Sequence, residues 1–179
     1  MTTQASTTRG QDQLWFGEIK PAPLGAVWAA VSPDGLRFVQ FGVSRREFER
    51  TIQTHERAQT RYTPAEVLPY LRQIQEYLAG ERQAFDLAID WSAMTPFQRQ
   101  VRKTVAAIPY GQTRAYGEIA AQLGNPNAPR AVGRANASNP MPLVIPCHRV
   151  IGPDGALRGY GGMGGVRTKR WLLDLERAN

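Results

Sequence analysis

The chain has 179 residues, of which 42% are hydrophobic, so it can bury the core of one sizeable domain or of two small ones. A single cysteine excludes an intrachain disulfide, and one cysteine with two histidines is too few for a zinc site built from those ligands. The net charge is +7, and no apolar run approaches the roughly 18 residues of a membrane span.

The excess of positive charge lies in the second part of the chain. Residues 1–100 hold 11 Lys and Arg against 11 Asp and Glu, whereas residues 101–179 hold 11 against four. A basic half indicates a polyanion partner such as nucleic acid. An arginine-rich proteome would also raise the pI, but it would not concentrate the excess in one half.

The beginning of the chain is polar and lacks the apolar stretch of a secretory signal. Residues 1–13 are therefore expected to form a disordered tail. The lone cysteine suits a reducing compartment, so we expect a cytoplasmic protein that does not associate with membranes.

After this tail, the first half alternates between strand and helix patterns. Short β-type runs predict strands over residues 14–19, 25–31, 36–42 and 85–91. A hairpin turn is expected at Ser32-Pro33-Asp34-Gly35, and a polar helix over residues 44–53. A second helix carries a core-facing stripe at spacings of three or four, formed by Val67, Leu71, Ile74 and Leu78.

The start of that second helix is ambiguous. Thr63-Pro64-Ala65-Glu66 has the pattern of a capping box with proline at the first helical position. Pro69 lies past the first turn, where proline breaks or kinks a helix, so a start near Leu68 is the alternative. With His55 as its only histidine, the first half shows no catalytic group, and residues 14–91 are expected to form a small α/β domain.

The second half has mostly helical patterns. Thr95-Pro96-Phe97-Gln98 predicts a capped helix that ends at Tyr110-Gly111. Further helices are predicted over residues 116–123, 128–137 and 165–177. The first two of these are joined by a tight turn and predict a helix-turn-helix. The expected fold class is therefore α+β, a small amino-terminal sheet with helices followed by a mostly helical domain over residues 92–179.

Small side chains dominate the helix predicted over residues 128–137, with Arg130 and Arg134 as the long exceptions. Small residues allow a helix to approach a nucleic-acid backbone closely, and arginines contact phosphates. An ordinary alanine-rich helix packed into a core has the same composition, so the pattern alone leaves both interpretations open.

The only cysteine lies in Pro146-Cys147-His148-Arg149. The apolar run Leu143-Val144-Ile145 before it and the turn signal Gly152-Pro153-Asp154-Gly155 after it predict that Cys147 ends a buried strand. A thiolate is the nucleophilic form of cysteine, and a neighbouring imidazole helps to produce it near neutral pH. The alternative is a structural cysteine, because free cysteine is among the most buried residue types.

The stretch from Asn139 to Val150 resembles the active-site signature of the O6-alkylguanine-DNA alkyltransferases, also called methylated-DNA–protein-cysteine methyltransferases. The resemblance extends over residues 95–176, a little under half of the chain. It also includes five other blocks in order: Thr113 to Tyr116, Gly124-Asn125-Pro126, Ala128 to Gly133, Gly159 to Gly162, and Lys169 with Trp171-Leu172-Leu173. The first half resembles the family's amino-terminal domain only in length and layout.

This resemblance implies that Cys147 takes an alkyl group from O6-alkylguanine, and from O4-alkylthymine, in duplex DNA. His148, oriented by Glu176, would draw the proton from sulfur through a bridging water. Tyr116 matches a tyrosine that donates to the ring N3 of the departing base, and Asn139 matches a hinge asparagine. No metal or cofactor is implied, and the alkylated protein is consumed, so transfer would be stoichiometric.

The resemblance also implies how DNA is bound. The target base would be flipped out of the stack, because it cannot be reached inside the duplex. Arg130 matches an arginine that fills the vacated space, and the approach is through the minor groove. The remaining expected contacts come from the same helix: Ala128, Ala131, Gly133 and Arg134. The expected partner is duplex DNA bound by a monomer, with cooperative binding along DNA left open.

Five positions would line the substrate pocket by the same resemblance: Pro142, Arg149, Val150, Tyr160 and Gly161. Pro142 would pack against larger alkyl groups, and Arg149 would order the loop. The segment from Tyr160 to Trp171 is about two residues longer than in typical relatives, with the extra length in the glycine-rich stretch 161–165. The size of the accepted alkyl group is therefore open.

Three other functions are alternatives to alkyl transfer. A lesion-sensing relative of the same fold would lack the cysteine. A thiol hydrolase would need Cys147 and His148 in direct contact, whereas neighbouring side chains on a strand point to opposite faces. A helix-turn-helix regulator would need more base-reading side chains than the short alanine-rich helix offers.

Overall fold

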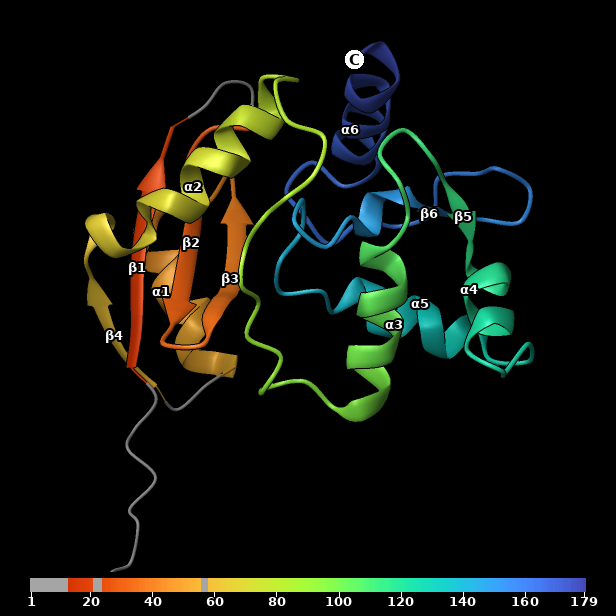
Figure 1. The fold of residues 1–179 in the computed structure, drawn as a ribbon, viewed down its shortest axis with the longest axis horizontal. Coiled ribbons are helices and arrows are strands. Elements are labelled where there is room, and N and C mark those ends of the chain that lie inside the picture. The colour runs from red at the N-terminus through yellow and green to blue at the C-terminus, as the bar shows by residue number, and fades with distance from the viewer. Residues whose placement is uncertain (1–12, 21–23, 56–57) are drawn as a thin grey trace, which may run out of the picture.

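The computed structural model describes residues 13–20, 24–55 and 58–179. The tail expected over residues 1–13 therefore lies outside the described residues, apart from Gln13, which begins the first strand. The described part divides into a half built on a sheet and a mostly helical half (Figure 1).

The first half is a four-stranded sheet in the order β3-β2-β1-β4. Its strands are β1 (Gln13–Ile19), β2 (Val27–Ser32), β3 (Gly35–Phe41) and β4 (Gln59–Tyr62). The first three are antiparallel and confirm the predicted strands and the hairpin, in which Ser32 pairs with Gly35. The sequence did not predict β4, a short and largely exposed edge strand parallel to β1.

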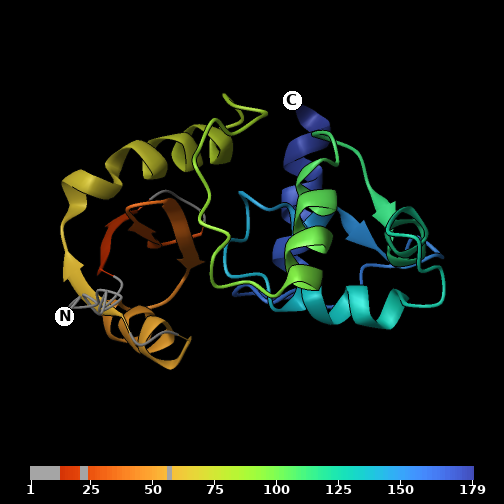
Figure 2. The ribbon, with the colours of Figure 1, turned by 60° about the horizontal axis from the view of Figure 1, so that its bottom comes forward.

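Two helices cover opposite faces of this sheet, α1 (Arg45–His55) and α2 (Pro64–Leu78), as Figures 1 and 2 show from two directions. The alternation of side chains along each strand explains this arrangement. Trp28 and Ala30 of β2 pack with Phe48 and Ile52 of α1, while the intervening β2 side chains join the main core with α2.

Helix α2 starts at Pro64 and runs through Pro69, so the alternative start near Leu68 is wrong. Proline has no N–H to donate to the preceding turn, and its presence removes one helical hydrogen bond. The stripe beginning at Val67 and Leu71 is fully buried against the sheet. This burial offsets the lost bond, since tertiary packing supplies most of the stability of a helix.

The strand predicted over residues 85–91 is wrong. This segment makes only an isolated parallel bridge between Leu36 and Ile89. Around this bridge, Leu36 N donates to Ala88 O and Asp90 N donates to Leu36 O. The Asp90 carboxylate then pairs with Arg37 and accepts a hydrogen bond from Ser32, so side-chain contacts hold the segment against β3. A single ladder step is too little to form a strand.

The second half contains four α-helices among the described residues, α3 (Pro96–Ala106), α4 (Tyr116–Gln122), α5 (Pro129–Ala137) and α6 (Val166–Ala178). A short parallel pair, β5 (Arg114–Ala115) with β6 (Val150–Ile151), was not predicted. The capping box of α3 is confirmed, because Gln98 N donates to Thr95 Oγ1 and Thr95 N donates to Gln98 Oε1.

The segment before Cys147 is a buried turn, so the strand predicted there is wrong. Pro140, Pro142 and Pro146 lack the N–H groups that a strand ladder needs. Ile145 N donates to Met141 O at 2.9 Å, which closes the turn. Cys147 then begins a short 3-10 helix, η1 (Cys147–Arg149).

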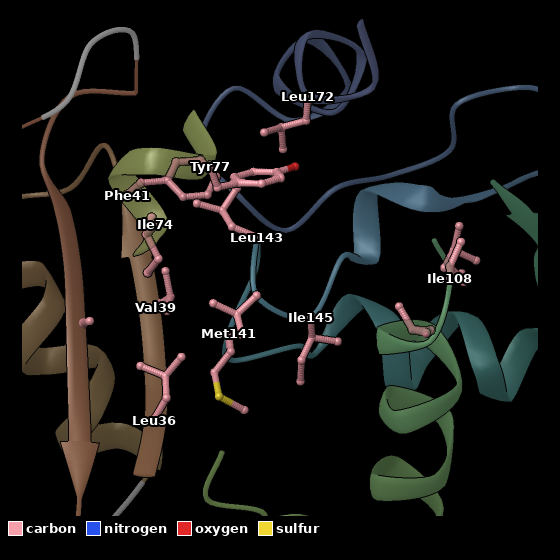
Figure 3. Close-up of a cluster of buried hydrophobic side chains, with 14 of the residues drawn as sticks. Leu36, Val39, Phe41, Ile74, Tyr77, Ile108, Met141, Leu143, Ile145 and Leu172 are labelled. Atoms are coloured by element: carbon pink, nitrogen blue, oxygen red, sulfur yellow. The ribbon is translucent and has the colours of Figure 1, made fainter. Parts of the chain in front are cut away.

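The largest hydrophobic cluster joins the two halves. Figure 3 shows Val39 and Phe41 of β3 facing Met141 and Leu143 of the proline-rich turn. A backbone hydrogen bond from Val39 N to Pro140 O, 2.8 Å long, adds to this contact. The fold class is therefore α+β, as expected. Within the described ranges, no helix has both the length and the apolarity to cross a membrane.

Candidate active site

Cys147 lies where the proline-rich turn meets η1, with only 6% of its surface exposed. Its backbone is held on both sides, because Cys147 N donates to Ile145 O and Asn136 Nδ2 donates to Cys147 O. Burial raises the pKa of the Cys147 thiol, although a hydrogen bond from Asn139 and the charge of Lys169 act against this rise. The sulfur is therefore a protonated thiol at rest and needs a base.

His148, the residue after Cys147 in the chain, is fully buried. Its Nε2 lies 2.7 Å from Glu176 Oε1, and since the carboxylate accepts, Nε2 carries the hydrogen. Burial lowers the pKa of His148, so the imidazole is neutral. Nδ1 then presents a lone pair, and no hydrogen-bond partner for it exists among the described residues. The imidazole is thus a base with one free acceptor.

The Glu176 carboxylate accepts hydrogen bonds from several other donors as well. The guanidinium of Arg149 donates to both carboxylate oxygens, and Gly111 N donates to Oε2 at 3.1 Å. Burial alone would raise the pKa of Glu176, but the hydrogen bonds from His148 and Arg149 lower it to about 2. The carboxylate therefore stays charged and fixes the imidazole.

Tyr77 of α2 is a site residue that the sequence did not indicate. Its hydroxyl donates to Glu176 Oε1 at 2.6 Å and lies 3.2 Å from His148 Nε2. Figure 3 shows the hydroxyl pointing out of the sheet half toward α6. The first half, which showed no catalytic group in the sequence, thus contributes to the active-site network. A tyrosine on a core-facing helix stripe gave no signal of this contact.

Tyr116 begins α4 and is half-buried. Burial raises the pKa of its phenol, while a hydrogen bond with Asn136 acts in the opposite direction. Asn136 therefore links Tyr116 to the backbone of Cys147. Asn136 was not predicted as a site residue, although its spacing of four from the buried Val132 places both on the inner face of α5.

Asn139 connects the end of α5 to the turn before the cysteine. Its Nδ2 donates to Ile145 O at 2.8 Å, and its Oδ1 accepts from Met141 N at 3.1 Å. With its hydrogen bond to the Cys147 sulfur, this side chain fixes the turn in three places. A residue in this position can hold the nucleophile rigidly.

Two buried cations brace the loops around η1. Arg149 donates to Ile108 O as well as to Glu176, and it is not among the residues that line the cavity described below. Lys169 of α6 donates to Val150 O at 2.6 Å and to Arg158 O at 3.2 Å. The backbone of Val150 is thereby fixed at the start of β6.

A cavity of about 560 Å³ opens at Cys147, and Pro142 and Gly161 are part of its lining. Tyr160 lies beside it with its ring stacked on Phe41, 6.4 Å between ring centroids. The structure thus brings three of the five expected pocket residues to the cysteine's surroundings, while Val150 and Arg149 brace the backbone.

The residues expected to contact DNA lie on α5, except Ala128, which directly precedes it. Arg130 and Arg134 are exposed, whereas Ala128, Ala131 and Gly133 are half-buried. A Cβ atom at Gly133 would lie 3.8 Å from the Tyr116 ring, so α5 packs closely on α4 here.

Comparison with known proteins relates this site to one family. The family model for the DNA-binding domain of 6-O-methylguanine DNA methyltransferase matches residues 96–178. The methylated-DNA–protein-cysteine methyltransferase of Mycobacterium tuberculosis is 48% identical over 128 residues, which cover 70% of this chain and 76% of that protein. The constitutive enzyme of Bacillus subtilis is 40% identical over 155 residues, covering 87% of this chain and 91% of that protein.

The similarity also includes the sheet half. The crystal structure of Mycobacterium tuberculosis OGT in complex with DNA superimposes with a TM-score of 0.77 at 38% identity and covers 93% of both chains. The likeness is thus wider than the 95–176 region in which the sequence motifs lie. The chain belongs to the methylated-DNA–protein-cysteine methyltransferase family.

Proposed function

We propose that the protein repairs DNA by transferring a methyl or larger alkyl group from O6-alkylguanine, and from O4-alkylthymine, in duplex DNA to Cys147. One observation carries this proposal: a rigidly held, buried cysteine is followed in the chain by a buried, neutral histidine whose Nδ1 is free to accept a proton. Family membership supports the same activity, since relatives are named for methyl transfer from DNA to a protein cysteine.

The chemistry is a displacement at the alkyl carbon. The Cys147 proton passes through a bridging water to His148 Nδ1, and Glu176 stabilises the imidazolium that forms. The sulfur–carbon bond forms as the carbon–O6 bond breaks, and the electron pair passes to the guanine. Tyr116 then donates to the ring N3, for which its raised phenol pKa keeps the proton available.

DNA binding belongs to the second half, residues 92–179, which we propose acts as a domain distinct from residues 14–91. Helices α4 and α5 would serve as a helix-turn-helix that approaches the minor groove, with phosphates contacted by Arg134 and by backbone groups. Arg130 would take the place of the flipped base in the stack. The protein would bind DNA as a monomer, because one chain supplies the whole site.

The reaction consumes the protein. A thioether has no good leaving group, so the alkyl group stays on Cys147 and each molecule acts once. A buried free thiol is also suited to a reducing compartment, and we therefore place the protein in the cytoplasm.

The proposal is tested with a duplex that carries one O6-methylguanine. Wild-type protein should restore guanine, and Cys147→Ala should bind the duplex without restoring it. Loss of the methyl group with Cys147→Ala would contradict transfer to this residue.

The proposed role of Arg130 needs a separate comparison. Arg130→Ala should slow transfer from duplex DNA far more than transfer from the free base O6-methylguanine, because only the duplex requires base flipping. Arg72→Ala, an exposed arginine on α2, is the matched control and should change neither rate. Equal slowing on duplex and free base would exclude the flipping role.

A further inference from the structure

The cavity at Cys147 is much larger than a methyl group requires. Its volume is about 560 Å³, and it extends from the cysteine to the sheet half, where Phe38 of β3 and Phe48 of α1 line it. Pro142 is also part of its lining. A substituent on O6 that is longer than methyl can therefore extend from the reacting carbon into this space.

The charged residues in the cavity wall are all basic. The described residues that line it include Arg37, His55 and Arg102, and none of them is an aspartate or a glutamate. Arg37 is neutralised, because its guanidinium pairs with Asp90 and also donates to Ser92 at 2.7 Å. His55 lies at the exposed end of α1.

Arg102 of α3 is different, because no carboxylate in the described part of the chain pairs with it. Its side chain is buried, with 3% of the residue exposed, and its Nη2 donates to Ser138 O at 2.5 Å and to Ser138 Oγ at 3.1 Å. Both acceptors are neutral. Its Nε is buried and has no hydrogen-bond partner among the described residues. A buried cation with an unused N–H group is unfavourable until an anion reaches it.

Arg102 is also close enough to the nucleophile to affect it. Its charge lowers the pKa of the Cys147 thiol, in opposition to the larger effect of burial. The cavity therefore has a nucleophile and an unpaired guanidinium in its lining.

We propose that the cavity accepts O6-alkyl groups that end in a carboxylate, with carboxymethyl as the smallest example, and that Arg102 binds the carboxylate. This inference rests on the proposed function, since it extends the alkyl groups that Cys147 removes. Sγ would bond to the methylene carbon, the carbon–O6 bond would break, and the electron pair would leave with the guanine, which takes up a proton. The product on the protein is S-carboxymethylcysteine.

The positive charge of the Arg102 guanidinium would favour the reaction of such a substrate. A carboxylate attached to the reacting carbon lies beside the sulfur as the thiolate forms, and two like charges at this distance repel each other strongly in a buried site. Arg102 offsets that repulsion. A neutral alkyl group receives no comparable benefit, so the effect should depend on the charge of the substituent and not on its size.

The alternative is that Arg102 only caps the end of α5, where its acceptors Ala135 O and Ser138 O lie. A capping role affects stability but cannot distinguish between two substituents of the same size. The experiment therefore compares O6-carboxymethylguanine with O6-carbamoylmethylguanine, in which a neutral amide replaces the carboxylate.

Binding is measured first with Cys147→Ala protein and duplexes that carry either base, because this variant cannot react. The carboxymethyl duplex should bind about tenfold to a hundredfold more tightly, the range for a hydrogen bond to a charged group. Equal affinities would overturn the inference and leave the proposed function intact. Failure of wild-type protein to remove methyl from an O6-methylguanine duplex would instead overturn the proposed function.

Transfer rates then test Arg102 itself. The ratio of the carboxymethyl rate to the carbamoylmethyl rate should fall about tenfold or more in Arg102→Gln and should be largely kept in Arg102→Lys, which retains the charge. Taking the ratio cancels any general loss of folded protein. A ratio that is the same in wild type and Arg102→Gln would show that Arg102 does not bind the substituent.

Discussion

Glu176 is the residue on which the active-site network converges. It accepts hydrogen bonds from the side chains of Tyr77, His148 and Arg149 and from Gly111 N. These donors come from α2, η1 and the loop after α3, so one carboxylate on α6 joins four parts of the chain. Its low pKa is the direct result of this saturation.

The pKa of Glu176 predicts how stability depends on acid. The folded-state value of about 2 lies below the ordinary 4.5, so the carboxylate stabilises the fold above pH 4.5 and loses this contribution as the pH falls toward 2. The difference corresponds to about 3 kcal/mol. Wild-type protein should lose about that much more than Glu176→Gln between pH 4.5 and 2, as measured by urea unfolding. Identical losses would contradict the assignment.

Tyr77→Phe removes one donor from this network without changing the shape of the core. The free energy of unfolding should fall by about 1–3 kcal/mol, because a hydrogen bond to a buried charge is lost. Methyl transfer should slow as well, since His148 loses part of its support. Tyr70→Phe on the same helix is the control and should have little effect on either measurement. If the Tyr77→Phe protein were as stable and active as wild type, the Tyr77 hydroxyl would not support the network.

At the scale of helices and strands, local patterns in the sequence predicted most of the described fold. The Thr95–Gln98 capping box and the stripe starting at Val67 are local signals, and both lie where they were expected. The pair β5–β6 and the edge strand β4 escaped prediction, because strands of two to four residues depend on partners far along the chain. The strand prediction over residues 85–91 failed for the same reason, since the position of β3 decides how many of these residues form ladder hydrogen bonds.

Site residues that belong to a sequence motif could be predicted, whereas those that join the site through tertiary contacts could not. Cys147 and His148 stand in a recognisable block, but Tyr77 reaches Glu176 across 99 residues. The buried cysteine segment was taken for a strand because it is apolar, yet its prolines and the positive φ of Leu143, 76°, require a turn.

Replacing threonine with alanine should have different effects at the start of α3 and at the start of α2. Thr95→Ala should destabilise the protein by about 1 kcal/mol, because it removes the hydrogen bond that caps α3. Thr63→Ala should change little, since the Thr63 side chain makes no capping bond to α2. Thermal unfolding of both variants checks this. A larger loss for Thr63→Ala would contradict the difference between the caps.

At the scale of the whole molecule, the two halves share one hydrophobic cluster and one active-site network. The cluster buries Met141 and Leu143 against β3 and α2, and the network joins Tyr77 to Glu176. The sheet half therefore contributes to the active site, because it fixes the turn that holds the nucleophile. Unfolding of one half should expose the core of the other.

This shared core predicts a single unfolding transition. Met141→Ala, at a position with no exposed surface, should cost about 2–5 kcal/mol and lower the stability of both halves together. Met163→Ala, at a position 55% exposed, is the control and should change stability by less than about 0.5 kcal/mol. Hydrogen exchange resolved along the chain is the measurement. Destabilisation confined to the helical half would contradict the shared core.

Irreversible transfer to Cys147 is tested by measuring the intact mass of the protein after it is mixed with a duplex that carries one O6-methylguanine. Each protein molecule should gain the mass of one methylene group, located in the peptide that contains Cys147, and should gain no more when DNA is in excess. Tight binding with no change in mass would contradict it and would make the protein a lesion sensor.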